Sequence, residues 1–202
     1  MDVQESMRRI LQAESAAIAA IPVTEAYDRA VEAIIERVHH RGGKLITSGM
    51  GKAGQIAMNI ATTFSSTGTP AVYLHPSEAQ HGDLGVVRPD DVVLLISNSG
   101  KTREIVELVH LLDGLYSGIP KIVITGAPES PLTELADITL LTAQAPEVCP
   151  FGLTPTTSTT MMTVIGDVLV VNVMNNIPFT RADYAKRHHG GYLGSAARGE
   201  TK

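Results

Sequence analysis

The chain has 202 residues, of which 44% are hydrophobic and 18% are charged, and its net charge is -5. This length suits one domain with a packed core, and the composition excludes wholesale disorder. The acidic balance argues against a nucleic-acid partner, because phosphate backbones attract a basic face. Cys149 is the only cysteine, so no disulfide can form within the chain, which fits a reducing compartment.

Two helices are predicted ahead of the first strand, over 3–20 and 24–40. They are separated near Pro22, and we expect Thr24 to be the N-cap of the second helix. The N-terminus has no basic segment followed by an apolar stretch, so we expect no secretory signal and a cytoplasmic protein.

Strands and helices then alternate along the chain. Short apolar runs predict strands over 44–48, 71–75, 91–96, 121–125 and 138–142. Helical patterns predict helices over 51–66, after Ser77, and over 102–116, 131–136, 156–174 and 183–187. This alternation indicates a parallel sheet with helices on both faces. We therefore predict an α/β fold, a three-layer sandwich around a five-stranded parallel sheet that is doubly wound as in flavodoxin.

The helix predicted over 156–174 is apolar nearly all round from Met161 onward. Its most apolar part, 161–174, is interrupted by Gly166, Asp167 and Asn172, so we expect this segment to be too short and too polar to span a bilayer. Because it is apolar on nearly every side, we expect a core helix that also forms an oligomer face. The alternative is a core helix alone.

Residues 1–202 are predicted to form a single domain, because no repeat, linker or low-complexity run divides them. N-terminal helices occupy 1–40, the sheet and site occupy 44–194, and a mobile tail is expected over 195–202. Ligands of parallel sheets bind at the carboxyl ends of the strands, where this chain gathers small polar residues.

The strongest chemical signal follows the strand over 91–96. Ser97, Asn98 and Ser99 end the apolar run, and Thr102 begins a helix. A helix N-terminus has unpaired N–H groups and the positive end of the helix dipole. The segment is therefore predicted to bind an anion, the phosphate of a small metabolite. The alternative is an ordinary helix cap, for which one serine would suffice.

Gly49, Gly51 and Gly54 match the G-x-G-x-x-G pattern of dinucleotide-binding proteins. Those proteins need an acid at the end of the second strand, where this chain has His75, so nicotinamide binding is disfavoured. The glycines still allow a ligand to approach the backbone closely. Lys52 brings a positive charge into the same turn.

Two glutamates are candidate acid–base groups. Glu104 lies just inside the helix that follows the anion site, where the alternative role is a partner of the helix dipole. Glu147 lies in a loop bracketed by prolines and is either a general base or a surface acid. Cys149 follows in the same loop, and we expect it to be a buried structural thiol rather than a nucleophile.

The histidines form two groups. His75 and His81 have Glu78 between them, but the spacing and third ligand of a metal site are lacking, so we expect no metal. His188 and His189 precede two glycines. An imidazole there can shuttle protons near neutral pH, and the alternative is a helix C-cap.

Six motifs occur in one order along the chain: SGMGKAG at 48–54, HPSEAQHGD at 75–83, SNSG at 97–100, EVCPFG at 147–152, TPTTSTT at 154–160 and HHGGYLG at 188–194. Together they resemble the sugar isomerase (SIS) domain of the arabinose-5-phosphate isomerase family. The resemblance implies a homotetramer with sites at subunit boundaries. It also implies an enzyme that interconverts D-arabinose 5-phosphate and D-ribulose 5-phosphate through an enediol or enediolate, without a redox cofactor, for Kdo and lipopolysaccharide synthesis.

The resemblance also assigns site residues. It implies catalytic roles for Lys52, Glu104, Glu147 and His188. It implies phosphate-binding hydroxyls at Ser48, Ser97, Ser99 and Thr102, and further substrate contacts at Gly49, Gly51, His75, His81, Asn98 and His189. Which glutamate is the base stays open. So does the choice between the two histidines, because many relatives have Ser-His-Pro-Gly-Gly where this chain has Arg-His-His-Gly-Gly.

Two alternative functions stay open. One is another sugar-phosphate isomerase, acting on a hexulose or heptulose phosphate, and the other is a non-catalytic regulator that binds a sugar phosphate. Many relatives continue into two regulatory CBS domains, which we do not expect here. We therefore expect control to act on the domain itself, through a downstream Kdo-derived product, and we expect no nucleic-acid or membrane partner.

Overall fold

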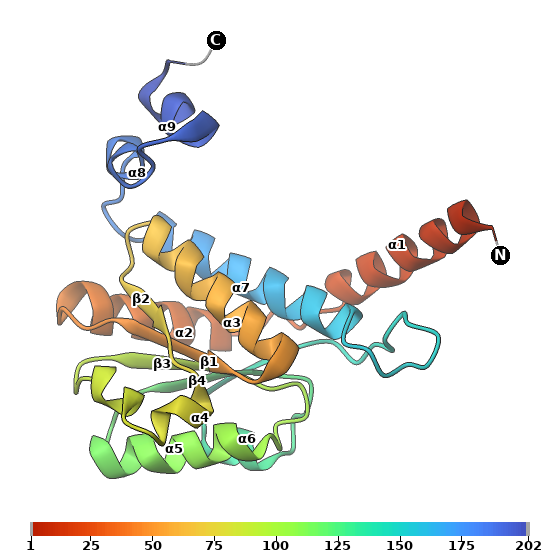
Figure 1. Ribbon diagram of the computed structural model, residues 1–202, viewed down its shortest axis with the longest axis horizontal. Helices are drawn as coiled ribbons and strands as arrows, with labels where there is room; N and C mark the ends of the chain where they lie inside the picture. The colour runs from red at the N-terminus through yellow and green to blue at the C-terminus, as the bar shows by residue number, and fades with distance from the viewer. Residues whose placement is uncertain (1, 201–202) are drawn as a thin grey trace.

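The computed structural model describes residues 2–200 and contains one five-stranded sheet (Figure 1). The strands are β1 (Leu45–Gly49), β2 (Ala71–Tyr73), β3 (Val92–Ile96), β4 (Lys121–Thr125) and β5 (Ile138–Leu141). All pairs are parallel, and the order across the sheet is β2-β1-β3-β4-β5. This is a doubly wound order whose direction reverses between β1 and β3, so the predicted fold class is confirmed.

Helices cover both faces of the sheet (Figure 1). One face carries α2 (Ala26–Ile34), its continuation η1 (Ile35–His40), α3 (Gly51–Ser66) and α7 (Thr157–Asn175). The other face carries α4 (Pro76–Ala79), the short turn η2 (Asp83–Val86), α5 (Arg103–Leu115) and α6 (Pro131–Leu135). The strands β1, β3 and β4 are buried throughout, because both faces are covered.

The helix α7 is the central helix of its layer. Ile165 and Leu169 are fully buried, and α3 packs closely on α7 because a Cβ at Gly166 would meet the Ile60 side chain at 2.5 Å. The length and hydropathy of α7 alone would also suit a membrane span. Half of that apolar window is buried inside the fold, as in a core helix. Val171, however, is 53% exposed, so part of its apolar surface is uncovered in a single chain.

Both ends of the described chain project from the sheet layers (Figure 1). At one end stands α1 (Val3–Ala19), and at the other α8 (Arg181–Arg187) and α9 (Gly191–Arg198) pack on each other. The helix α9 was not predicted from the sequence, and residues 195–198, placed in the tail by the sequence, form its end. Gly199 closes that helix with a left-handed φ of 77°, whereas residues 201–202 lie outside the described chain.

Two other boundaries differ from the prediction. The N-cap of α2 is Glu25 rather than Thr24, and it makes no side-chain cap hydrogen bond. The edge strand β2 ends at Tyr73, because His75 already precedes Pro76 at the start of α4. Proline at the first helical position has a backbone φ that favours a helix, so the strand is cut short.

A buried carboxylate joins the amino ends of β1 and β3. Asp91 is fully buried and accepts hydrogen bonds from the backbone N–H groups of Lys44 at 2.9 Å and Arg88 at 2.8 Å. The Lys44 ammonium group donates to it at 2.8 Å. These contacts fix the two central strands in register where they begin.

Replacing Asp91 by Ala is expected to lower the free energy of unfolding by about 3 kcal/mol, because it leaves three donors without their acceptor. The exposed neighbour Asp90 provides a matched control. Asp90→Ala should change the free energy of unfolding by less than about 0.5 kcal/mol. Urea denaturation of both variants measures the difference. Equal effects of the two substitutions would contradict the structural role given to Asp91.

Candidate functional site

Two helices begin side by side at the carboxyl edge of the sheet. The strands β1 and β3 are neighbours, with Gly49 opposite Ile96, and α3 and α5 follow them directly. In doubly wound sheets this reversal point leaves a crevice for ligands. The N-cap residues Met50 and Thr102 make no side-chain cap hydrogen bond within residues 2–200. Both helix starts are therefore open at the same place.

The turn between β3 and α5 has a fixed shape. The hydroxyls of Ser97 and Thr102 lie 2.8 Å apart and hydrogen-bond each other across it. Gly100 has a left-handed φ of 61°, and a Cβ there would collide with the Ser130 hydroxyl. Only glycine fits this position, so the turn is held in one conformation.

The backbone of this turn presents unpaired donors. Among the described residues, the N–H groups of Ser99, Thr102 and Arg103 donate to no other residue, and Asn98 and Ser99 are exposed. By contrast, α1, α6 and α8 each have a side-chain cap. Open amides next to hydroxyls at a helix N-terminus suit an anion, so the geometry supports the anion site expected from the sequence.

Lys52 and Glu104 are each the second residue of their helix, α3 and α5 respectively. Lys52 is exposed and Glu104 is half-buried. Neither side chain makes a hydrogen bond or ion pair with any other residue in the part of the chain that the structure describes. The reversal point thus has one amine and one carboxylate that are available to a ligand.

Other predicted side chains near this edge are engaged elsewhere. The Ser48 hydroxyl is buried and donates to the Leu74 carbonyl at 2.7 Å, so it holds the end of β1 against the turn after β2. His75 is half-buried with its ring edge-on to Tyr73, and its Nδ1 is buried without a partner among the described residues. His81 is exposed beyond α4. Within residues 2–200, no three His, Cys, Asp or Glu side chains form a group that could hold a metal.

The start of α7 binds the Glu147 carboxylate. This carboxylate accepts hydrogen bonds from the Thr156 N–H at 2.7 Å, the Thr156 hydroxyl at 2.8 Å, the Ser158 N–H at 3.4 Å and the Ser158 hydroxyl. Burial pushes the pKa of Glu147 upward, but the hydrogen bonds from Ser158 and Thr156 outweigh burial and leave the pKa below its ordinary value. Thr156 and Ser158 were not predicted as site residues, although the Thr- and Ser-rich run around them was the available signal.

His188 and His189 do not join the other predicted residues within one chain. They follow α8, whose Arg187 lines a shallow depression together with the last turn of α3. Lys52 is in the first turn of α3, and the 16 residues of that helix span about 24 Å. The His188 ring stacks on Tyr184 with the ring centroids 3.8 Å apart.

Cys149 is half-exposed, so the expectation of a buried thiol is wrong. Its Sγ accepts hydrogen bonds from the N–H groups of Thr154 at 3.1 Å and Leu153 at 3.2 Å. The Thr154 N–H contributes most to lowering the pKa of this thiol, to about 7. Such bonds stabilise the thiolate and make the thiol more reactive at neutral pH.

Alkylation of Cys149 by iodoacetamide is therefore expected to accelerate with a midpoint near the pKa of about 7. Because the chain has one cysteine, the mass of the adduct followed over time reports this site alone. A midpoint at roughly 8.5, as in model peptides, would contradict the hydrogen-bonded thiolate.

Comparisons with known proteins identify relatives along most of the chain. Residues 39–172 match the SIS domain family. The arabinose 5-phosphate isomerase KdsD of Yersinia pestis is 45% identical over 196 residues, which cover 96% of this chain and 58% of the relative. The enzyme of the same name from Pseudomonas aeruginosa is 47% identical over 75% of this chain and 46% of its own length. The chain thus spans about half the length of the curated relatives it matches.

Solved structures match over nearly their whole length. A candidate phosphosugar isomerase involved in capsule formation from Bacteroides fragilis is 63% identical, with a TM-score of 0.92 over 93% of this chain and 98% of that one. The Escherichia coli CFT073 protein c3406, solved in complex with arabinose 5-phosphate, is 34% identical, with a TM-score of 0.85 over 93% and 97% of the two chains.

Proposed function

From the finding that the chain belongs to the SIS domain family, we propose that it is an arabinose 5-phosphate isomerase. It interconverts D-arabinose 5-phosphate and D-ribulose 5-phosphate and serves the synthesis of Kdo for lipopolysaccharide. One observation carries the proposal: two open helix starts meet at the reversal point of the sheet, with Lys52 and Glu104 in their first turns.

The phosphate of the sugar binds at the turn between β3 and α5. The amides of Ser99, Thr102 and Arg103 donate to its oxygens, and the hydroxyls of Ser97 and Ser99 complete the contact. Binding energy from the phosphate, which takes no part in the chemistry, orients the other end of the sugar. Ser48 acts indirectly, since its hydroxyl is committed to the backbone next to the site.

The reaction moves protons within one molecule. A carboxylate, of Glu104 or Glu147, removes the proton from C2 of the open-chain aldose while the C1 oxygen gains a proton. The C2 hydroxyl of the resulting enediol then loses its proton, and C1 receives one, which gives the ketose. Lys52 stabilises negative charge on the oxygens as it develops. Electrons stay within the sugar, so the balance needs no external oxidant or reductant.

A histidine of the last motif opens the sugar ring, and it comes from a second copy of the chain. The position of His188 beside the far end of α3, away from Lys52, supports this assignment. His189, which is exposed next to it, is the alternative donor. The site is then shared between copies, as a homotetramer with sites at subunit boundaries requires.

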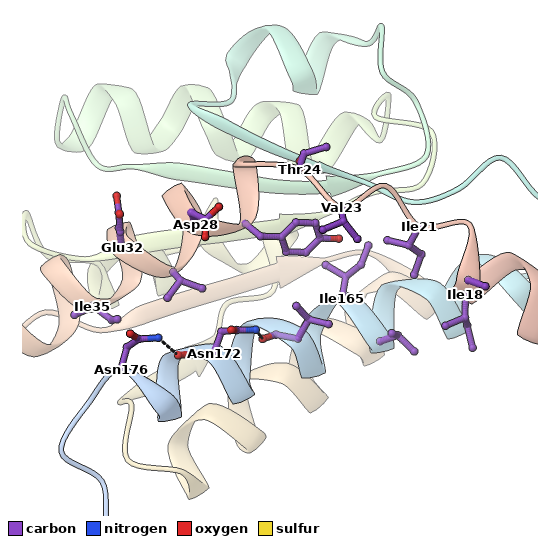
Figure 2. Close-up of a pocket in the computed structure, with 15 residues that line it drawn as sticks. Ile18, Ile21, Val23, Thr24, Asp28, Glu32, Ile35, Ile165, Asn172 and Asn176 are labelled. Carbon is purple, nitrogen blue, oxygen red and sulfur yellow. Dashed lines mark hydrogen bonds between the residues drawn. The ribbon is translucent and has the colours of Figure 1, made fainter.

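Uncovered apolar surfaces support such an assembly. On α1, Val3, Met7 and Leu11 are 72%, 56% and 59% exposed. A cavity of about 550 Å³, lined mainly by apolar side chains, lies between α7 on one side and the end of α1, the α1–α2 connection and α2 on the other (Figure 2). Figure 2 shows Ile18, Ile21 and Ile165 at this cavity. Surfaces of this kind mark contacts with other chains.

Location and regulation complete the proposal. The protein works in the cytoplasm, which its single cysteine and lack of a possible intrachain disulfide support. A downstream Kdo-derived product is the feedback ligand. The carboxylate of this product is an anion. The open amides at the start of α5 can bind it in the same way as they bind phosphate.

The direct test is isomerisation of arabinose 5-phosphate, assayed with and without a chelator, beside hexose and heptose phosphates. Replacing Lys52 by Ala should lower kcat by about 10²–10³-fold, because it removes the charge that stabilises the enediolate. Gln55→Ala, an exposed change one turn along α3, should leave kcat within about twofold. A fully active Lys52→Ala variant would refute the role of the lysine.

Mixing two inactive variants tests the shared site. Lys52→Ala and His188→Ala should each be inactive alone, whereas random co-assembly should restore about a quarter of the wild-type activity, since one site in four has both intact residues. Activity is measured after the two tagged chains are co-expressed and purified together. If co-purified assemblies stay inactive although both variants are folded, the two residues do not act across a subunit boundary.

A further inference from the structure

We propose that Glu147 is a positioning residue that fixes the start of α7, and that Glu104 is the carboxylate that transfers the proton. This inference rests on the proposed isomerase function and decides between its two candidate bases.

Four hydrogen bonds hold the Glu147 carboxylate in place. Oε2 accepts three of them, from the N–H and hydroxyl of Thr156 and the N–H of Ser158, and Oε1 accepts one from the Ser158 hydroxyl. A general base must reach the proton that it removes through a free lone pair. In Glu147 only Oε1 keeps a free lone pair, whereas Glu104 accepts no hydrogen bond from any described residue, and the direction of the pKa shift of Glu147 agrees with an anion stabilised as a cap.

The start of α7 needs this carboxylate. The N-cap residue Thr156 makes no side-chain cap hydrogen bond, so the first N–H groups of a 19-residue helix depend on an acceptor from outside the helix. A negative charge at this end of a long helix is favourable because of the helix dipole. Glu147 therefore caps α7. It lies ten residues before the first residue of that helix, in the loop that carries the motif at 147–152.

The surroundings of Glu147 also differ from those of the anion site. A cavity of about 430 Å³ beside Glu147 is lined by Arg9 and Ile10 of α1 and by the loop from Pro146 to Pro150. The charged and titratable groups at this cavity besides Glu147 are Arg9 and Cys149. Its lining includes no residue of the turns that carry the open amides of α3 and α5. The carboxylate of Glu147 therefore belongs to the α1–α7 side of the site.

The position of α7 affects the position of α3, because the two helices pack on each other. α7 packs on α3 where Gly166 meets Ile60, and the first turn of α3 carries Lys52. The cap on α7 therefore helps to place the lysine. Glu104, in contrast, is an unpaired carboxylate among the described residues, in the first turn of α5 and next to the phosphate-binding turn.

The first experiment compares Glu147→Gln with Glu104→Gln in the full chain. The amide oxygen of glutamine still accepts hydrogen bonds but cannot remove a proton. We expect Glu147→Gln to keep kcat within about 10-fold, with a lower Tm and with exchange of solvent deuterium into the sugar, whereas Glu104→Gln should lose roughly 10³-fold in kcat and the exchange. A 10³-fold loss of kcat in Glu147→Gln at unchanged Tm would overturn the proposal.

The second experiment leaves both carboxylates in place and keeps the proposal falsifiable if Glu147→Gln fails to fold. Ser158→Ala removes one donor that lowers the pKa of Glu147. If Glu147 were the base, the acidic limb of the kcat–pH profile would move to higher pH in this variant. We expect Tm to fall and the limb to stay where it is in the wild type, and a shifted limb would overturn the assignment.

These outcomes separate the inference from the proposed function. A wild-type protein that does not isomerise arabinose 5-phosphate refutes the proposed function. An active wild type combined with an inactive, stable Glu147→Gln variant refutes only the inference.

The cap can also be tested through the pH dependence of stability. Because folding lowers the pKa of Glu147, the stabilisation by its carboxylate is present at neutral pH and is lost as the pH falls through the pKa of the folded protein. The difference in Tm between the wild type and Glu147→Gln should therefore become smaller as the pH is lowered.

Discussion

Two unpaired helix N-termini at the reversal point of the sheet are the constraint on which this structure depends. Buried or partly buried N–H groups need an acceptor, and α1, α6 and α8 satisfy theirs with their own side chains. At α3 and α5 the turns after β1 and β3 leave the amides open instead. In the proposed function the phosphate of the sugar is the acceptor there, and the rest of the sugar lies between the first turns of both helices.

The fold follows from patterns that are local in the sequence. Strands buried on both faces are continuous apolar runs, such as Val92–Ile96, and they alternate with helical segments, which together specify a doubly wound sheet. Two elements differ from the prediction. The helix α9 was not predicted, and it packs on α8, a contact that no local pattern reports. The edge strand β2 is shorter than predicted because Pro76 already begins α4.

The candidate site divides in the same way. The positions of the turn at 97–102, Lys52 and Glu104 could be predicted from local sequence, because each lies at a strand-to-helix junction that the fold fixes. The environment of Glu147 could not be predicted from the sequence, because it depends on which hydroxyls at the start of α7 contact the carboxylate. The exposure of Cys149 depends on loop conformation in the same way. The place of His188 is set by how α8 and α9 leave the sheet layers and, in the proposed assembly, by a second copy.

The most direct test of the central claim is a crystal structure of the protein with arabinose 5-phosphate bound. We expect phosphate oxygens within hydrogen-bond distance of the amides of Ser99 and Thr102, with C1 and C2 of the sugar beside Lys52 and Glu104. A phosphate bound elsewhere, with the turn at 97–102 left without ligand, would contradict it.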